Sequence, residues 1–151
     1  MSAIRVRRIG STDDLAGAAE LLIRFFREEQ FDAPDDVIRR NAAIMAGLDN
    51  CGLFIAESSG KVIGVATVSL EFGIEFGWGA EMGDLYVLTE WRGKGVARLL
   101  VSAIESFLTE RGATTYQITL TPYAQGAHDL KAFYDRLGFA GEGRLILAKK
   151  L

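Results

Sequence analysis

The segment Leu85-Tyr86-Val87-Leu88-Thr89-Glu90-Trp91-Arg92-Gly93-Lys94-Gly95-Val96-Ala97 combines the end of a strand, a glycine-rich turn and the start of a helix. Its first residues are apolar and typical of a strand, and Val96 begins a stretch with helical spacing. Two glycines separated by one residue let the backbone turn sharply and approach a ligand without a Cβ in the way. The sequence therefore predicts a strand–loop–helix unit whose loop is shaped for a bound group.

The start of the predicted helix offers a place for an anion. The first N–H groups of a helix have no partner inside it, and the macrodipole makes this end positive. A pyrophosphate fits such a position. Arg92, Lys94 and Arg98 add formal positive charge around it. A glycine-rich turn with solvated basic residues is the alternative interpretation of the same residues.

Spacing excludes two common nucleotide-binding loops. The Rossmann fingerprint needs a third glycine three residues after the second, where Arg98 stands. A Walker loop needs Gly-Lys followed by Ser or Thr, whereas Lys94 is followed by Gly95. The segment instead resembles the loop of the GNAT superfamily of N-acetyltransferases. That loop has Arg or Gln, two residues, Gly, one residue, then Gly or Ala, and Arg92, Gly95 and Ala97 supply it in order.

The resemblance implies a binding site for acetyl-CoA, which is the co-substrate in this family and requires no metal. Backbone amides of the loop would bind the pyrophosphate of CoA, and the preceding strand would hydrogen-bond the pantetheine arm like an added strand. A backbone N–H in that strand would also polarise the thioester carbonyl. The cofactor-binding residues predicted in this way are Leu85, Tyr86, Val87, Arg92, Gly93, Lys94, Gly95, Val96, Ala97 and Arg98.

The stretch Leu130-Lys131-Ala132-Phe133-Tyr134-Asp135-Arg136-Leu137-Gly138-Phe139 resembles a second signature of the family, a helix with Tyr followed by Leu-Gly-Phe. The resemblance implies that Tyr134 gives a proton or a hydrogen bond to the thiolate that aminolysis of a thioester expels. The alternative role for Tyr134 is packing beside Phe133. Many members carry Asn seven residues before this Tyr, where it touches the cofactor arm. Ala127 stands there, so that contact is lost, moved or replaced.

A second group must take a proton from the amine, which is mostly protonated at neutral pH. Glu81 matches the position where some family members carry a glutamate base, and Asp84 is the second candidate. Strand alternation places the two on opposite faces unless a bulge intervenes, so we expect one of them to reach the substrate. A solvated surface charge is the alternative role for each.

Composition excludes several classes of protein. The 151 residues are 49% hydrophobic and 25% charged, which fits one soluble domain over residues 1–151. A net charge of -3 argues against broad nucleic-acid binding. No apolar run approaches the ~20 residues of a membrane span. Cys51 is the only cysteine, and the single His and the spacing of the acidic residues suggest no metal cluster. With no signal-peptide core at its start, we expect a cytoplasmic protein.

The hydrophobic periodicity predicts the element order βααβββαβαββ. This is an α/β fold with a mixed central sheet flanked by helices, as in the GNAT superfamily. The last two strands would form a hairpin around Gly143, with the final strand at residues 144–148.

The predicted function is acetyl transfer from acetyl-CoA to a primary amine, by direct attack in a ternary complex. The acidic residues favour a cationic small-molecule amine, and Phe72, Phe76 and Trp78 are candidates for an apolar wall of its site, or for the core or a dimer interface. A protein N-terminus or lysine is the alternative acceptor. A non-catalytic sensor of acyl-CoA and an interaction module are two further interpretations of the same sequence. Several family members are homodimers, which favours a homodimer here.

Overall fold

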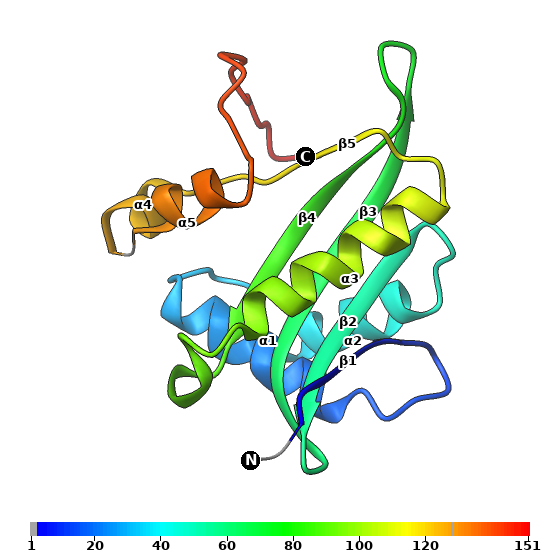
Figure 1. Cartoon of the computed structure of the whole chain (residues 1–151), viewed down its shortest axis with the longest axis vertical. Coiled ribbons are helices and arrows are strands. Elements are labelled where there is room, and N and C mark those ends of the chain that lie inside the picture. The colour runs from blue at the N-terminus through cyan, green and yellow to red at the C-terminus, as the bar shows by residue number, and fades with distance from the viewer. Residues whose placement is uncertain (1–2, 128) are drawn as a thin grey trace. The chain divides into compact units, whose positions relative to one another are not determined.

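The computed structural model describes residues 3–127 and 129–151 of the chain. Contacts between Cα atoms divide it into two compact units, Met1–Ile118 and Thr119–Leu151. That the two fold as a single domain stays a prediction. The elements of the first unit are β1 (Arg5–Ile9), α1 (Ala16–Glu28), α2 (Asp35–Ala46), β2 (Cys51–Ser58), β3 (Lys61–Gly73), β4 (Gly77–Val87), the 3-10 turn η1 (Thr89–Trp91), α3 (Val96–Glu110) and β5 (Thr115–Gln117) (Figure 1).

The first unit is a mixed five-stranded sheet with helices on both faces. The strand order is β1-β2-β3-β4-β5, in which β4 and β5 are parallel and all other neighbours are antiparallel. Helices α1 and α2 lie on one face of the sheet and α3 on the other (Figure 1). Gly64 of β3 lies against Val96 and Leu100 of α3, and Tyr86 of β4 packs against Phe25 of α1. The predicted α/β class with a mixed sheet is confirmed.

The core lies at the centre of the sheet, on both of its faces. Because helices cover both faces, the middle strands are continuously apolar instead of alternating. Helix α3 presents one apolar stripe, since its buried residues recur at helical spacing. Burying one such aliphatic side chain stabilises the fold by about 1.5–3 kcal/mol. The largest side chains that are almost wholly buried are Ile9, Leu53, Ile63, Val65, Val68, Val96, Leu100 and Ile104.

Helix α1 ends in a Schellman motif. The amide of Phe31 donates to the carbonyl of Phe26 at 2.8 Å, and the amide of Gln30 donates to Arg27 at 3.2 Å. The rings of Phe26 and Phe31 lie 5.2 Å apart, which is the apolar contact typical of this motif. Gln30 has φ of 62°, the left-handed conformation that favours glycine.

Gln30→Gly is therefore expected to stabilise the protein. Removing the Cβ relieves about 1–2 kcal/mol of left-handed strain, and the greater freedom of glycine in the unfolded chain offsets roughly 0.5–1 kcal/mol of that. The free energy of unfolding, measured in urea, should rise by about 0.5–1 kcal/mol. A lower free energy of unfolding would mean that the Gln30 side chain makes a stabilising contact that outweighs the strain.

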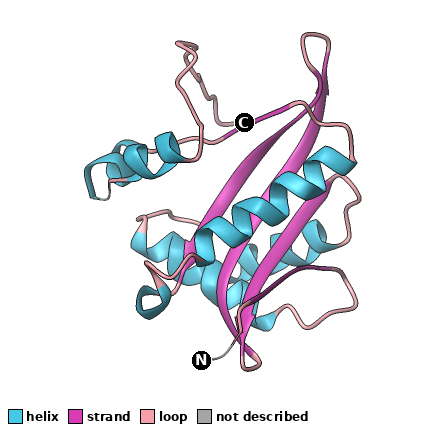
Figure 2. Ribbon diagram, in the orientation of Figure 1, coloured by secondary structure: helices cyan, strands magenta, loops and turns pink. Residues whose placement is uncertain are grey.

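The second unit contains α4 (Pro122–Ala127) and α5 (Leu130–Arg136), followed by an irregular segment (Figure 2). The sequence predicts helix α5, and a left-handed glycine follows the end of this helix: Gly138 has φ of 93°, and the amide of Phe139 donates to the carbonyl of Tyr134 at 3.1 Å. The sequence does not predict helix α4. It is a single short element that contains Gly126, so it carries too few apolar positions to show a period.

The predicted C-terminal hairpin is wrong. Residues 144–148 form no strand, and Leu145 and Leu147 are 88% and 89% exposed. The apolar run predicts a strand, yet a strand also needs a hydrogen-bonded neighbour, and no described strand pairs with this segment. The observed order therefore follows the predicted one through β5 and α5, with α4 added and the last two strands absent from the described residues.

Candidate functional site

The loop between β4 and α3 has the shape predicted for an anion site. We call residues 92–97 the glycine loop. Gly93 and Gly95 have φ of 75° and 84°, and no atom lies within 4 Å of the position that a Cβ would occupy at either residue. Gly95 is the N-cap of α3, whose first turn contains no acidic residue. The positive end of a 15-residue helix is therefore presented on an open backbone surface.

Beside the glycine loop, β4 has an edge that no described strand covers. Strand β5 pairs with β4 only at Gly79, Ala80 and Glu81. The amide of Leu88 donates to Ile63 of β3, so by alternation the backbone groups of Val87 are directed away from β3. An extended ligand could hydrogen-bond this edge as an added strand would.

The basic residues of the loop are engaged with the protein. Arg92 Nε donates to the carbonyl of Val87 at 2.9 Å, which joins the loop to the end of β4. Lys94 Nζ lies 5.1 Å from the centre of the Trp91 ring. Sequence reasoning treats Arg92 as a source of charge, whereas the structure gives it defined partners.

A β-bulge brings the two candidate bases to the same face of the sheet. Glu81 lies opposite Ser69, and Asp84 lies opposite Thr67. Because Thr67 and Ser69 are two residues apart on β3, their side chains and those of their partners share a face. Gly83 is the extra residue on β4, and it overturns the opposite-face placement that simple alternation predicts.

Asp84 has the environment of a base with raised proton affinity. Burial raises the pKa of Asp84, a hydrogen bond from Thr67 Oγ1 to Asp84 Oδ2 at 2.5 Å opposes that shift, and the charge of Glu81 adds to it. Glu81 Oε2 in turn accepts a hydrogen bond from Gln117 Nε2 of β5 at 3.4 Å. The two carboxylates therefore influence each other across one short stretch of β4.

An aromatic cluster from α1 and the residues that follow it lies on the same face as these carboxylates. Tyr86, two residues after Asp84, packs against Phe25 with ring centres 5.8 Å apart. Phe25 also contacts Phe26 and Phe31. The sequence does not single out this cluster, because Phe25 and Phe26 have the helical spacing of a core-facing stripe.

Phe72 and Trp78 do not belong to this face. Counting along β3 from Gly64, which lies against α3, Phe72 falls on the α3 side and pairs with Trp78. Their rings are 5.2 Å apart, and Phe72 is 66% exposed. Phe72 and Trp78 therefore lie on the opposite face of the sheet from Glu81 and Asp84, while Phe76 lies in the turn of the hairpin. An apolar wall of the acceptor site formed by these residues stays a prediction.

Tyr134 lies in α5, within the second unit. It is 9% exposed and contacts Phe133 and Phe139, with ring centres 5.0 and 5.4 Å from its own. Burial raises the pKa of Tyr134 to about 12, so the phenol keeps its proton at neutral pH. Packing and proton donation are therefore compatible roles. Ala127 ends α4, and His128, its neighbour in the sequence, lies outside the described residues.

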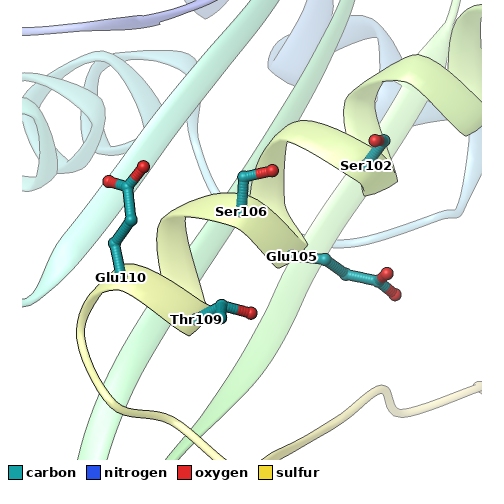
Figure 3. A pocket seen from close by; sticks show the side chains of 5 residues that line it. All are labelled: Ser102, Glu105, Ser106, Thr109 and Glu110. Carbon is teal, nitrogen blue, oxygen red and sulfur yellow. The ribbon is translucent and has the colours of Figure 1, made fainter.

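A shallow hollow lies along the outer side of α3 (Figure 3). All its lining residues are exposed and come from this one helix, so it encloses no ligand: Ser102, Glu105, Ser106, Thr109 and Glu110. Within residues 3–127 and 129–151, no group of three or more His, Cys, Asp or Glu side chains could hold a metal ion. No helix in that part of the chain is both long and apolar enough to cross a membrane.

The sequence is similar to those of known acetyltransferases. The model of the acetyltransferase (GNAT) family matches residues 15–139, which include the glycine loop and α5. The chain is 30% identical over 93 residues to the beta-lysine N(6)-acetyltransferase of Methanosarcina mazei, covering 62% of this chain and 32% of that protein. It is 32% identical over 87 residues to an N-acetyltransferase of Chlorobaculum tepidum, covering 57% of this chain and 48% of the relative. The matches thus span a third to a half of the length of these relatives.

Solved structures share the fold at low sequence identity. An aminoglycoside N-acetyltransferase in complex with CoA superimposes with a TM-score of 0.83 at 22% identity, covering 99% of this chain and 96% of the other. Glucosamine-6-phosphate N-acetyltransferase of Arabidopsis thaliana gives a TM-score of 0.74 at 17% identity, covering 97% and 98% of the two chains.

Proposed function

This chain belongs to the acetyltransferase (GNAT) family, and from that premise we propose that it transfers an acetyl group from acetyl-CoA to a primary amine. The observation that carries the proposal is the glycine loop at the positive end of α3, directly beside the uncovered edge of β4. The loop amides suit a pyrophosphate, and the strand edge suits an extended arm. Acetyl-CoA supplies the thioester that an amine can attack.

We assign the cofactor contacts to backbone groups. The amides of residues 93–97 bind the pyrophosphate, and the groups of Leu85 and Val87 that are directed away from β3 bind the pantetheine arm. An amide on this edge also polarises the thioester carbonyl and stabilises the negative charge that develops on its oxygen. No metal takes part in this scheme.

We assign Asp84 as the base and Glu81 as the residue that helps to receive the cationic amine. The carboxylates share a face, and the raised pKa of Asp84 makes it a better proton acceptor than an ordinary aspartate. Tyr134 then donates a proton or a hydrogen bond to the departing thiolate. The amine attacks directly in a ternary complex, so no acetylated enzyme forms.

Asp84→Asn should lower kcat/KM by roughly 100-fold, because it removes the proton acceptor while keeping the shape of the side chain. In the wild-type protein, kcat/KM should rise with pH through the raised pKa of Asp84, and this acid limb should be absent in the variant. The measurement is kcat/KM between pH 5 and 9, with release of free CoA thiol as the readout.

Stability provides the control for this variant. The pKa of Asp84 is higher in the folded protein than in the unfolded chain. Ionisation of Asp84 therefore lowers the free energy of unfolding as the pH rises above the pKa of the unfolded chain. Asp84→Asn should therefore unfold at the same temperature as the wild type, or a higher one, at pH 7. Glu81→Gln should retain the acid limb. If the limb disappears in Glu81→Gln and persists in Asp84→Asn, Glu81 is the base.

The acceptor that we propose is a small molecule with a cationic amine. The carboxylates of Glu81 and Asp84 attract an ammonium group, and the aromatic rings of Phe25 and Phe31 lie on the same face. Relatives and structural neighbours carry names that refer to beta-lysine and aminoglycosides. A panel of diamines, polyamines and aminoglycosides, assayed with acetyl-CoA, tests this class. Acetylation of peptides alone would indicate a protein N-terminus or lysine as acceptor, and CoA binding without any turnover would indicate a sensor.

Location and assembly are proposals as well. Cys51 is buried and unpaired, in keeping with a reducing cytoplasm. The net charge of -3 disfavours nucleic acid as a partner. We propose a homodimer on the example of other family members, which light scattering of the purified protein would test.

A further inference from the structure

The C-terminal end of α1 places a carboxylate, that of Glu28, next to the first residue of the glycine loop. Glu28 Oε1 accepts a hydrogen bond from the Tyr86 hydroxyl at 2.8 Å, and Glu28 Oε2 lies 3.5 Å from Arg92 Nη2. The helix itself does not favour a negative charge there, because its macrodipole is negative at this end. The hydrogen bond from Tyr86 and the ion pair with Arg92 offset this unfavourable effect of the helix on the carboxylate.

Arg92 is held on several sides by the protein. Its Nε donates to the carbonyl of Val87 at 2.9 Å, its Nη2 faces Glu28, and its Cζ lies 5.4 Å from the centre of the Tyr86 ring. The guanidinium is a planar fork, so contacts at two of its nitrogens fix its orientation. Arg92 thereby joins the glycine loop to the end of β4 and to α1.

Tyr86 is the third member of the network. It is 5% exposed, and its ring packs against Phe25 of α1. Its hydroxyl donates to Glu28, so a change that displaces this side-chain oxygen would leave a largely buried donor without this partner. Residues far apart in the chain therefore meet at the point where the loop leaves the strand.

We infer that Glu28 is a positioning residue for acetyl-CoA binding, which acts through Arg92 and Tyr86 to hold the glycine loop against the end of β4. The inference rests on the proposed function of that loop. The Glu28 and Arg92 side chains are 44% and 43% exposed, so their ion pair adds little to global stability. What the contacts fix is the local geometry of the Val87 carbonyl and of the residues that follow it.

Two roles for Arg92 predict opposite effects when Glu28 changes. If Arg92 served acetyl-CoA only by its charge, removal of the competing carboxylate would strengthen binding of the anionic cofactor. If Arg92 positions the loop, removal of its anchor weakens binding. The half-exposed charge of Glu28 is screened by salt and solvent, whereas a small displacement of binding groups can cost up to about 100-fold. We therefore expect the geometric effect to dominate.

The test is the dissociation constant of acetyl-CoA, measured by isothermal titration for wild type, Glu28→Gln, Arg92→Lys and the double variant. Glu28→Gln should weaken binding roughly 5- to 20-fold, with kcat at saturating acetyl-CoA changed less than about threefold. Arg92→Lys keeps the charge but loses the fork, and it should weaken binding to a similar degree. The double variant should be no weaker than Arg92→Lys alone. Glu20→Gln, which breaks an exposed ion pair with Arg24 on the same helix, is the matched control and should bind as the wild type does.

The outcomes separate this inference from the proposed function. Absence of acetyl-CoA binding by the wild type overturns the proposed function, and the inference with it. If the wild type binds acetyl-CoA and Glu28→Gln has an equal or lower dissociation constant, the inference alone is overturned. It is also overturned if the double variant loses as much affinity as the two single variants together. If Glu28→Gln does not fold, Glu28→Asp gives the same test, because it keeps the charge and withdraws it from Arg92 and Tyr86.

Discussion

Gly95→Val is expected to abolish measurable binding of acetyl-CoA while the protein still folds. Gly95 has φ of 84° and caps α3, where the proposed pyrophosphate approaches the backbone. A valine side chain would occupy that approach and strain the backbone. Charge-assisted hydrogen bonds contribute about 1.5–3 kcal/mol each, so loss of two or more weakens binding by about 100-fold or beyond. Titration with acetyl-CoA measures the effect.

Gly112→Val is the matched control for this variant. Gly112 has φ of 79°, follows the other end of α3, and likewise has no atom within 4 Å of the place of a Cβ. Both variants should lose about 1–2 kcal/mol of stability through the same backbone strain. Only Gly95→Val should lose measurable binding of acetyl-CoA. Equal affinities of the two variants would show that the glycine loop does not bind the cofactor.

Tyr134→Phe is expected to lower kcat by about 100-fold, because it removes the proposed proton donor to the thiolate. Binding of acetyl-CoA should change less than about threefold, since the ring and its contacts with Phe133 and Phe139 remain. Single-turnover and steady-state rates, together with titration, separate the two effects.

The raised pKa of Tyr134 adds a pH prediction. An acid must carry its proton, and with a pKa of about 12 the phenol stays protonated throughout the neutral and mildly alkaline range. The wild type should therefore lose no activity through Tyr134 between pH 7 and 10. Tyr123→Phe, at an exposed tyrosine of α4, is the matched control and should keep full kcat. Unchanged kcat in Tyr134→Phe would assign the proton to water or to another group.

The glycine loop and the elements on either side of it could be predicted from the sequence because their signals are local. The apolar residues at 85–87, the two glycines and the stripe of α3 each follow from neighbours within a few positions. The structure confirms that Gly93 and Gly95 adopt left-handed φ and that α3 begins at Val96. The two helices that follow the first strand are predicted from periodicity in the same way.

The rest of the site depends on contacts between distant residues. Gly83 carries no signal of a bulge, because the extra residue is defined only by its register against Thr67 and Val68 of β3. Glu28 is 64 positions from Arg92, and no spacing rule relates them. The C-terminal segment is the opposite case, in which a local pattern gives a wrong prediction. Its apolar run is typical of a strand, but no strand among the described residues pairs with it.

The most direct test of the central claim is isothermal titration of the purified wild-type protein with acetyl-CoA, with ATP and NAD as controls. The glycine loop and the uncovered edge of β4 predict saturable binding of acetyl-CoA at one site per chain and much weaker binding of the other two. Equal affinities for acetyl-CoA, ATP and NAD would show that the loop binds anions without preference for CoA. Absence of acetyl-CoA binding would contradict the proposed acetyl transfer altogether.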